Sequence, residues 1–415
     1  MRVLLVHNYY GSSAPSGENQ VFEAERSMLQ RHGVEVEAFT RHSDEIRLVV
    51  GGWWLVNGLR KVWGLVKGAM CTVANPFAAR ALRKKIREFN PDVVHFHNTF
   101  PLISPLAIRA AKKSGAKVVM TLHNYRMVCA AGVPMRDGKV CRECFVLPEE
   151  SSNRVRRTIL PAICHRCYRD SLLATVPLAI NIWLYRKCWA KWVDKFIVLS
   201  EFQRGIMIEC GLPADKVVVK GNFVTIPNQA IEQSDNASAR SSVVFVGRLS
   251  DEKGVKTLLK AWRLPMSLPS PRTFTSTLAL IGDGDQRTEY EKLAKGLNVK
   301  FLGKLPHSEV MKVVSASKFL ALPSECWEGM PMTVLEAFSV GTPVIVSDLG
   351  ALPDYVGHGK FGEIFKAGDA DGLAGAIVRL ERRLEREDVG IAAREQAVRE
   401  YSEGVNLERL MAVYR

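Results

Sequence analysis

Residues 243–262 read VVFVGRLSDEKGVKTLLKAW: a short apolar run, a loop of small and charged residues, and a segment with apolar residues at helical spacing. The run at 243–246 is rich in β-branched residues and predicts a buried strand, and the spacing after residue 254 predicts a helix. A strand that passes through a short loop into a helix is the unit of a doubly wound parallel sheet. We therefore expect such units to recur along the chain.

The same alternation occurs on both sides of this stretch. In the second half we expect further strands near 278–281, 319–322 and 344–346, and helices near 286–296, 332–339 and 372–387. In the first half we expect strands near 3–6, 93–97 and 118–122, and helices near 20–31, 76–88 and 106–114. Each half therefore predicts an α/β, doubly wound parallel sheet.

A polar segment separates the two halves. Residues 228–242 are small and polar and show no periodicity, which places the domain change near 224–242. We therefore expect two Rossmann-like domains that face one cleft, at residues 1–225 and 226–395, followed by a C-terminal segment at 396–415.

Composition excludes several classes of protein. Of the 415 residues, 47% are hydrophobic, more than disordered or collagen-like chains contain. The longest apolar run without a charge, residues 171–185, is shorter than the roughly 18 to 20 residues that span a bilayer. The start, MRVLLVH, lacks the apolar length and the cleavage site of an export signal, so we expect a cytoplasmic location.

The charge is unevenly distributed. The net charge is +14, yet the first 200 residues carry 30 Lys and Arg against 15 Asp and Glu, and the remainder carries 27 against 28. This asymmetry favours a surface that meets anions, whether nucleic acid, acidic lipid headgroups or a phosphorylated acceptor. A solvated basic surface without a partner is the alternative.

Two cations lie in the loop of residues 247–254. Arg248 and Lys253 follow the strand at 243–246, and in open α/β sheets ligands bind at the carboxyl ends of strands. Arginine can contact two phosphate oxygens at once and lysine supplies a compact charge, so the loop could hold a diphosphate. A surface turn with solvated charges is the simpler interpretation of this loop taken alone.

A second anion-binding feature is expected near residue 331. Pro331 suits the first helical position, so Glu328, Gly329 and Met330 would lie just ahead of a helix whose free amides favour phosphate oxygens. Glu328 and, within the helix, Glu336 would repel a diphosphate, but carboxylates accept hydrogen bonds from sugar hydroxyls well. Two carboxylates could thus contact two separate hydroxyl-bearing parts of one ligand.

Three segments together resemble one enzyme family. FVGRLSDEKG (245–254), LIGDGDQR (280–287) and EGMPMTVLEAFSVGTPVIVSDLG (328–350) are similar to the phosphate loop, the glycine loop and the two-glutamate signature of the retaining glycosyltransferases of family 4. The resemblance implies the GT-B fold and extends over nearly the whole chain. Residues 401–415 look like the family's helix that crosses back onto the first domain.

The resemblance assigns roles in binding a nucleotide-diphosphate sugar. It implies that Arg248 and Lys253 hold the diphosphate of this donor. Glu328 would bind the hydroxyls of the donor sugar, and Glu336 the ribose. The other implied donor contacts are Gly329, Met330 and Pro331 at the sugar and phosphate, and Gly282 and Leu305 near the base. Met330 stands where an aromatic residue is common in the family, and Ala351 and Asp354 replace the usual Gly and Glu, which bears on which sugar fits.

In the first domain, the residue expected nearest the chemistry is His123. It follows the strand at 118–122, and the resemblance implies that it contacts the donor sugar close to the reacting carbon, as a neutral imidazole that donates a hydrogen bond. Gly17, the one glycine where the family usually has two, would let the backbone approach the acceptor or the donor phosphate. Glu18 and Asn19 are further candidates, and His95, His97 and Asn98 are either structural or acceptor-binding.

The resemblance also implies retention of configuration at the sugar. No clear nucleophile faces His123, so we expect substitution on one face of the sugar, with the leaving phosphate taking the acceptor's proton. Arg248, Lys253 and the helix at Pro331 would stabilise the charge of that phosphate without a metal ion. Together with His123 and Glu328, these cations form the expected catalytic set. The Asp-x-Asp segments at 283–285 and 369–371 are interpreted as turns.

Five of the nine cysteines cluster in an expected insertion at about 125–170. Cys141 with Cys144, and Cys164 with Cys167, form two Cys-x-x-Cys pairs that 19 residues separate, a spacing within the range of zinc sites. Cys129 would also qualify as a ligand. We expect either a structural zinc or iron site or a buried cluster of reduced thiols, and no cofactor for catalysis.

Two segments favour contact with an anionic membrane surface. Residues 48–70 interleave Trp53, Trp54 and Trp63 with basic residues, and residues 172–192 are apolar and then basic. Aromatic and basic amphipathic stretches are typical of helices at the lipid interface, or of a groove for a lipid-linked acceptor. Core helices are the alternative.

Three functions remain open on the sequence alone. The first is a glycosyltransferase with a nucleotide-sugar donor and a lipid-linked or polysaccharide acceptor, peripheral on the cytoplasmic membrane face, in surface polysaccharide biosynthesis. The second is a GT-B sugar-nucleotide epimerase. The third, a nucleic-acid-binding protein, ranks last because the basic half has no recognised binding motif and its aromatic residues are not spaced as a stacking platform.

Overall fold

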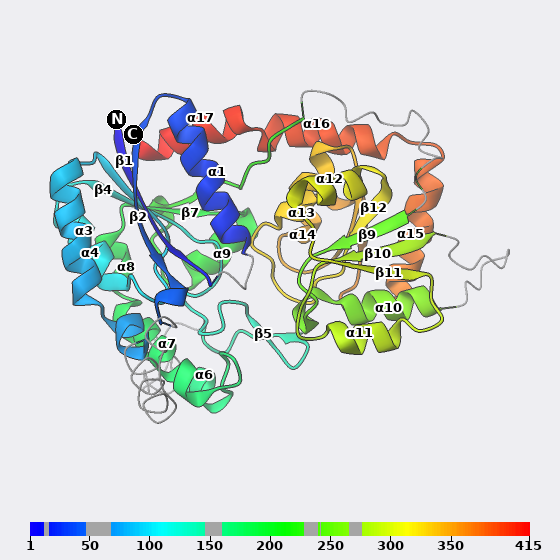
Figure 1. Cartoon of the computed structure of the whole chain (residues 1–415), viewed down its shortest axis with the longest axis horizontal. Helices are drawn as coiled ribbons and strands as arrows, with labels where there is room; N and C mark the ends of the chain where they lie inside the picture. Colours follow the sequence, from blue (N-terminus) through cyan, green and yellow to red (C-terminus); the bar gives the residue numbers. More distant parts are fainter. Residues whose placement is uncertain (12–15, 47–67, 146–159, 228–239, 241, 265–275) are drawn as a thin grey trace, which may run out of the picture. The chain divides into compact units, whose positions relative to one another are not determined.

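The computed structural model describes residues 1–415 apart from 12–15, 47–67, 146–159, 228–239, 241 and 265–275 (Figure 1). The chain forms two compact units, one made of Met1–Pro134, Arg142–Gly221 and Leu407–Arg415, the other of Met135–Cys141 and Asn222–Asn406. The division follows Gly221, a few residues before the expected boundary at 225. The chain returns to the first unit at Leu407, within the C-terminal segment expected at 396–415, and a short hairpin groups with the second unit.

The first unit is built on six parallel strands in the order β2-β1-β3-β4-β7-β8. Its strands are β1 (Arg2–Tyr9), β2 (Glu35–His42), β3 (Val93–Asn98), β4 (Lys117–Thr121), β7 (Lys195–Val198) and β8 (Val217–Val219). The three expected strands, β1, β3 and β4, are adjacent and buried, since helices cover a parallel sheet on both faces.

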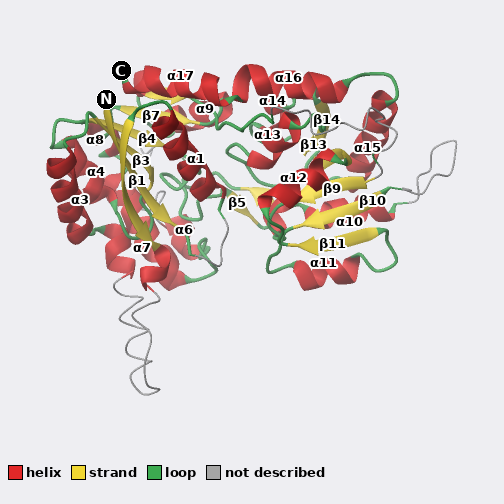
Figure 2. Ribbon diagram, turned by 45° about the horizontal axis from the view of Figure 1, so that its top comes forward, coloured by secondary structure: helices red, strands yellow, loops and turns green. Residues whose placement is uncertain are grey.

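Helices flank the strands of each sheet (Figure 2). Those of the first unit are α1 (Gly17–Arg31), α3 (Pro76–Phe89), α4 (Pro105–Lys112), α6 (Leu160–Cys164), α7 (Leu172–Tyr185), α8 (Trp189–Trp192) and α9 (Glu201–Glu209), with α17 (Glu403–Tyr414) joining it from Leu407. Helix α1 begins where the Ser16 hydroxyl accepts a hydrogen bond from the N–H of Glu18. Its buried face consists of Val21, Phe22, Glu25, Met28 and Leu29, so a carboxyl group lies in the middle of an apolar stripe.

The second unit repeats the architecture, with six parallel strands in the order β11-β10-β9-β12-β13-β14. Its strands are β9 (Ser242–Val246), β10 (Thr277–Ile281), β11 (Val299–Gly303), β12 (Ser317–Leu322), β13 (Val344–Ser347) and β14 (Gly362–Phe365). Its helices are α10 (Val255–Arg263), α11 (Arg287–Leu293), α12 (His307–Ser315), α13 (Met332–Ser339), α14 (Leu352–Tyr355), α15 (Ala370–Leu384) and α16 (Val389–Tyr401). The hairpin of β5 (Met135–Arg136) and β6 (Lys139–Val140) accompanies this unit.

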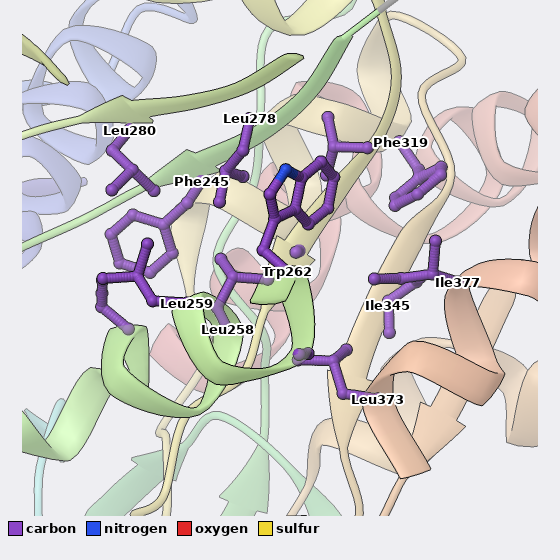
Figure 3. Packing of buried hydrophobic residues seen from close by; sticks show 14 of the residues in the cluster. Phe245, Leu258, Leu259, Trp262, Leu278, Leu280, Phe319, Ile345, Leu373 and Ile377 are labelled. Carbon is purple, nitrogen blue, oxygen red and sulfur yellow. The ribbon is translucent and has the colours of Figure 1, made fainter. Parts of the chain in front are cut away.

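A core on one face of the second sheet holds its strands in place (Figure 3). Phe245, Leu278 and Leu280 from the strands pack with Leu258 and Trp262 of α10, all at most 5% exposed. Burying an apolar side chain of this size stabilises the fold by roughly 1.5 to 3 kcal/mol. The core therefore fixes the strands whose carboxyl ends carry the predicted donor loops.

No helix in the described segments is both long and apolar enough to cross a membrane.

Close backbone contact brings the loop after β9 against the loop after β12. Gly254 has φ +67°, and a Cβ on this residue would lie 1.8 Å from the carbonyl oxygen of Pro323. Since backbone atoms cannot give way as a side chain can, only glycine fits this position.

Gly254→Ala should therefore destabilise the second unit by about 3 kcal/mol or more, through both the clash and the positive φ. Gly205→Ala is a matched control, because Gly205 lies within α9 and a Cβ there would meet nothing within 4 Å. Alanine should leave stability unchanged or raise it at that position. Thermal unfolding of both variants measures the difference, and equal midpoints would contradict the packing described here.

Candidate active site

Three loops meet at the carboxyl edge of the second sheet. They follow β9, β10 and β12, and β9 is the neighbour of both other strands. The N–H of Leu249 donates to the carbonyl oxygen of Asp283 at 3.1 Å, and the N–H of Glu325 donates to that of Glu252 at 2.9 Å. The predicted donor-binding residues on these loops therefore share one edge of the sheet, where α/β proteins bind ligands.

Lys253 and Glu328, both expected to contact the donor, contact each other. Lys253 Nζ lies 2.7 Å from Glu328 Oε1, and the Ser324 hydroxyl donates to the same oxygen at 2.6 Å. Burial disfavours both charges, but the attraction between the two groups outweighs it. The pKa of Lys253 is raised and the pKa of Glu328 is lowered. Both groups are thus charged at neutral pH, and a diphosphate would compete with Glu328 for the lysine.

Arg248 forms a much weaker ion pair than Lys253 does. Its side chain is 67% exposed, and its Nη1 lies 4.0 Å from Glu252 Oε1, at the outer limit of an ion pair. Exposed pairs of this kind contribute about 0 to 1 kcal/mol. The guanidinium can therefore turn to an incoming phosphate with little loss.

The helix expected near 332–339 is present as α13 (Met332–Ser339), and only the place of Pro331 differs from the expectation. Pro331 is the N-cap of α13 rather than its first helical residue. Just before it, the Tyr355 hydroxyl donates to the carbonyl oxygen of Gly329 at 2.7 Å. The Met330 side chain is buried, and its Sδ lies 3.0 Å from the N–H of Asn222. Met330 therefore packs within the second unit, and the first amides of α13 are the groups that could face an anion at this end.

Glu336 contacts a residue that sequence reasoning missed. His307 Nε2 lies 3.0 Å from Glu336 Oε1, and this hydrogen bond raises the pKa of His307. Glu336 is buried whereas the His307 side chain is 61% exposed. His307 is the first residue of α12 and follows Leu305 by two residues. Its closeness in sequence to Leu305, a predicted donor-binding residue, could have identified it. Gly282, at φ +135°, has no room for a Cβ, which would lie 1.8 Å from the carbonyl oxygen of Gly247.

In the first unit, the strand ends carry His97 and His123. His97 Nδ1 lies 3.1 Å from His123 Nε2. Burial lowers the pKa of His123 well below its ordinary value, so the imidazole is neutral at neutral pH. Both rings line a cavity of about 60 Å³, together with Asn124 and Arg126. His123 is thus placed at a site that can admit a small group.

The first turn of α1 lies next to this cavity. Glu18 Oε1 accepts a hydrogen bond from Asn124 Nδ2 at 2.6 Å, and burial raises the pKa of Glu18. Asn19 Oδ1 lies 2.9 Å from His7 Nε2. Gly17 is exposed at the start of the helix, and a Cβ there would meet no atom within 4 Å. The turn is therefore linked to the His123 loop through Glu18 and leaves the backbone of Gly17 accessible.

His95 and Asn98 make contacts that fit a structural role. His95 is fully buried, with Nδ1 2.8 Å from the Tyr414 hydroxyl and Nε2 2.8 Å from the Thr121 hydroxyl. Asn98 Nδ2 donates to the carbonyl oxygen of Asn8 at 2.8 Å. These bonds connect β3 with β1, β4 and α17. His97 and Asn98 both line the cavity, whereas His95 does not.

The cysteines do not form a ligand set in the described part of the chain. There, three ligating atoms within 4.8 Å of one another occur for Glu25, His95 and His97, and for no set of cysteines. Cys141 groups with the second unit and the other four predicted ligands with the first. None of the nine cysteines, all within the described segments, forms a disulfide, and burial raises the pKa of Cys129 to about 11. Among the described residues, no three of these cysteines therefore lie close enough to hold one ion, and the choice between a metal site and reduced thiols stays a prediction.

Comparison with known proteins shows the family. Residues 228–396 match the family model of glycosyl transferases group 1, and residues 17–226 match that of glycosyltransferase family 4. The chain therefore belongs to the group 1, family 4 glycosyltransferases.

Individual relatives agree with this assignment. The sulfoquinovosyl transferase of Arabidopsis thaliana is 27% identical over 318 residues, which are 75% of this chain and 54% of the relative. The phosphatidyl-myo-inositol mannosyltransferase of Mycobacterium leprae is 31% identical over 231 residues, 54% of this chain and 60% of the relative. The chain thus matches little more than half the length of these relatives. The solved structure of Anabaena HepE in complex with UDP-glucose superimposes with a TM-score of 0.62 at 18% identity, over 100% of this chain and 99% of that one, which confirms the GT-B fold.

Thiol labelling separates the two interpretations of the cysteines. Because Cys164 is exposed and Cys129 has a raised pKa, iodoacetamide at pH 8 should modify Cys164 at least about tenfold faster. A chelator should leave both rates unchanged. Mass spectrometry of the labelled peptides gives the rates, and protection of Cys164 that a chelator removes would establish a metal site instead.

Proposed function

We propose that this protein is a retaining glycosyltransferase that moves a sugar from a nucleotide diphosphate to a lipid-linked or polysaccharide acceptor. The proposal rests on one observation above all: Arg248, Lys253 and the start of α13 lie at one edge of the second sheet. An anion at this edge meets two cations and free helix amides. The UDP-glucose complex of HepE supports a donor of this class.

In the proposed reaction, the bond from the anomeric carbon to the diphosphate oxygen breaks while the acceptor hydroxyl bonds on the same face. The leaving diphosphate takes the acceptor's proton, and Arg248 and Lys253 stabilise its remaining charge. Lys253 exchanges its contact with Glu328 for one with phosphate. Glu328 then accepts hydrogen bonds from sugar hydroxyls, and His123 contacts the donor sugar. This scheme needs no metal ion.

Helix α7 supports an acceptor that is bound to a lipid. One face of the helix is buried, and the other exposes apolar side chains, with Leu173 79% exposed. The large exposed apolar residues of α7 are Leu172, Leu173, Trp183 and Leu184. The helix contains no charged residue, and the exposed Lys187 and Lys191 follow it. An apolar helix face with cations at its end suits the surface of an anionic membrane.

The buried face of the same helix reaches the cavity of the first unit. Leu178 and Ile182 line that cavity together with His123. A lipid-linked acceptor held at α7 would thus have its reacting end near His123. The name of the Mycobacterium leprae relative includes a phosphatidyl-inositol, which also supports a lipid acceptor. We therefore propose that the protein works at the cytoplasmic face of the membrane in surface polysaccharide biosynthesis. The tryptophans of residues 48–70 lie outside the described residues.

Removal of the site's cations tests donor binding. Lys253→Met combined with Glu328→Gln avoids leaving one buried charge unpaired. We expect this double variant, and Arg248→Ala, to bind UDP- or GDP-sugars at least about tenfold more weakly, since a hydrogen bond to a charged group contributes about 1.5 to 3 kcal/mol. Thermal shift over a panel of nucleotide sugars measures this, because ligand at about 100 times its Kd adds some 2.7 kcal/mol.

Lys256→Ala is the matched control for this experiment. Lys256 lies on α10, is exposed and pairs with Glu289, so its loss should leave the shift unchanged. Wild-type shifts in both site variants would contradict the proposed donor site. Transfer of labelled sugar to a separate acceptor, rather than its conversion within the nucleotide sugar, excludes an epimerase.

The α7 surface makes a second prediction. Leu173→Glu with Trp183→Glu should abolish sedimentation with vesicles that contain anionic lipid, and high salt should weaken binding of the wild type. Leu302→Glu, an exposed leucine on β11 of the second unit, should bind as the wild type does. Equal sedimentation of the α7 variant and the wild type would refute this surface as the membrane contact.

A further inference from the structure

The loop after β11 belongs to the edge of the second sheet that carries the expected donor-binding residues. The N–H of Gly282 donates to the carbonyl oxygen of Gly303 at 2.8 Å, so the loops after β10 and β11 are joined at this edge. Leu305 and His307 come next in the chain, and His307 is the first residue of α12. His307 therefore follows directly on residues expected near the base of a nucleotide.

Glu336, expected to bind the ribose, uses one of its carboxylate oxygens for this histidine. Oε1 of Glu336 lies 3.0 Å from Nε2 of His307. A carboxylate only accepts hydrogen bonds, so the ring donates from Nε2, as both the imidazolium and one neutral tautomer can do. The hydrogen bond from Glu336 is the main reason that the pKa of His307 is raised. One oxygen of the carboxylate is therefore held by α12.

The second oxygen of Glu336 is left for a ligand. In the part of the chain that the structure describes, His307 is the one residue that forms a hydrogen bond or an ion pair with this carboxylate. The side chain of Glu336 is 10% exposed, so little water can solvate it. A carboxylate in such surroundings is costly unless its oxygens accept hydrogen bonds. Oε2 can therefore gain from an incoming donor.

The place of Glu336 on α13 suits a donor that belongs to a nucleotide. Glu336 follows the N-cap Pro331 by five residues, which is about 7 to 8 Å along the helix axis. The first amides of α13 could face a diphosphate, and the ribose is the next group along a nucleotide diphosphate. A ribose carries two neighbouring hydroxyls, and acidic side chains are known to accept hydrogen bonds from such hydroxyls in dinucleotide sites.

We propose that His307 is a positioning residue that fixes the carboxylate of Glu336 toward the two hydroxyls of a ribose, so that the site selects ribonucleotides. The proposal rests on the proposed function, which supplies the nucleotide. Without His307, the glutamate side chain would regain rotational freedom and would have to be ordered when the ligand binds. A site built to hydrogen-bond a hydroxyl strongly rejects an analogue that lacks it.

Two other roles of His307 make different predictions. If the contact served only stability, it would add little, because the His307 side chain is 61% exposed and solvent weakens such pairs. If the exposed ring itself touched the base or the phosphates, its loss would weaken the binding of every nucleotide by the same factor. Action through Glu336 instead changes the preference for ribose over a sugar without its hydroxyls.

The test measures this preference in His307→Ala, His307→Gln and wild-type full-length protein. Isothermal titration calorimetry gives Kd for UDP and GDP and for the 2′,3′-dideoxy form of each. The wild type should bind the preferred ribonucleotide at least about tenfold more tightly than its dideoxy form, since the hydroxyls bond to a charged group. His307→Ala should reduce this ratio to about threefold or less, with Kd for the dideoxy form within about twofold of the wild type. His307→Gln should keep the wild-type ratio, because its amide nitrogen can donate where Nε2 does.

Lys312→Ala is the matched control. Lys312 lies on the same helix, is 70% exposed and pairs with Glu309, so its loss should leave every Kd unchanged. A wild type without preference for ribose overturns the proposal. So does a His307→Ala variant that keeps the wild-type ratio, whether its affinities stay the same or fall equally for both forms. A wild type that binds neither UDP nor GDP would refute the proposed function and this role with it, whereas the expected ratios in a protein that transfers no sugar would refute the proposed function alone.

Discussion

Close approach of backbone to backbone at the carboxyl edge of the second sheet is the constraint on which the candidate site depends. A Cβ at Gly254 or at Gly282 would lie 1.8 Å from a carbonyl oxygen of a neighbouring loop. Because glycine leaves this space free, the three loops come close enough for their N–H and C=O groups to bond directly. The contact between Lys253 and Glu328 follows from that spacing, since the two residues lie on different loops. The placement of the two charged side chains therefore follows from a backbone arrangement that residues larger than glycine would prevent.

Each unit contains a lysine paired with a glutamate. The two pairs differ in burial, and burial determines what each pair can do. The side chains of Lys253 and Glu328 are 22% and 12% exposed, whereas those of Lys220 and Glu25 are 4% and 2% exposed. A pair that is exposed to solvent can exchange a partner for an incoming anion, because water can solvate each charged group while the exchange takes place. A pair without solvent access would leave an unpaired buried charge if either member moved, at a cost of about 3 to 5 kcal/mol. The first pair therefore suits the binding and release of an anion, and the second suits a permanent structural contact.

The sequence predicted the central strands and not the edges. Strands β1, β9 and β12 contain continuous apolar runs of four residues because both faces of a parallel sheet are covered. Edge strands β2 (EVEAFTRH) and β11 (VKFLG) are partly exposed and lack such runs. The donor loops were found because glycine, proline and charge occur at fixed spacing. Glu25 and His307 were missed because their partners, Lys220 and Glu336, are distant in sequence and only the fold brings them together.

Glu25 nevertheless left a signal in the sequence that spacing alone does not capture. It occupies a position on α1 that the apolar stripe of Val21, Phe22, Met28 and Leu29 would give to a leucine. Replacing a buried ion pair by apolar residues is often neutral or stabilising, so stability does not account for a glutamate there. What a leucine could not supply is a partner for the buried ammonium group of Lys220, whose Nζ donates to Glu25 Oε2 at 3.1 Å. A carboxylate in an apolar stripe therefore indicates a buried polar cluster beneath α1, in which Glu25 pairs with Lys220 and lies 3.1 Å from ring nitrogens of His95 and His97.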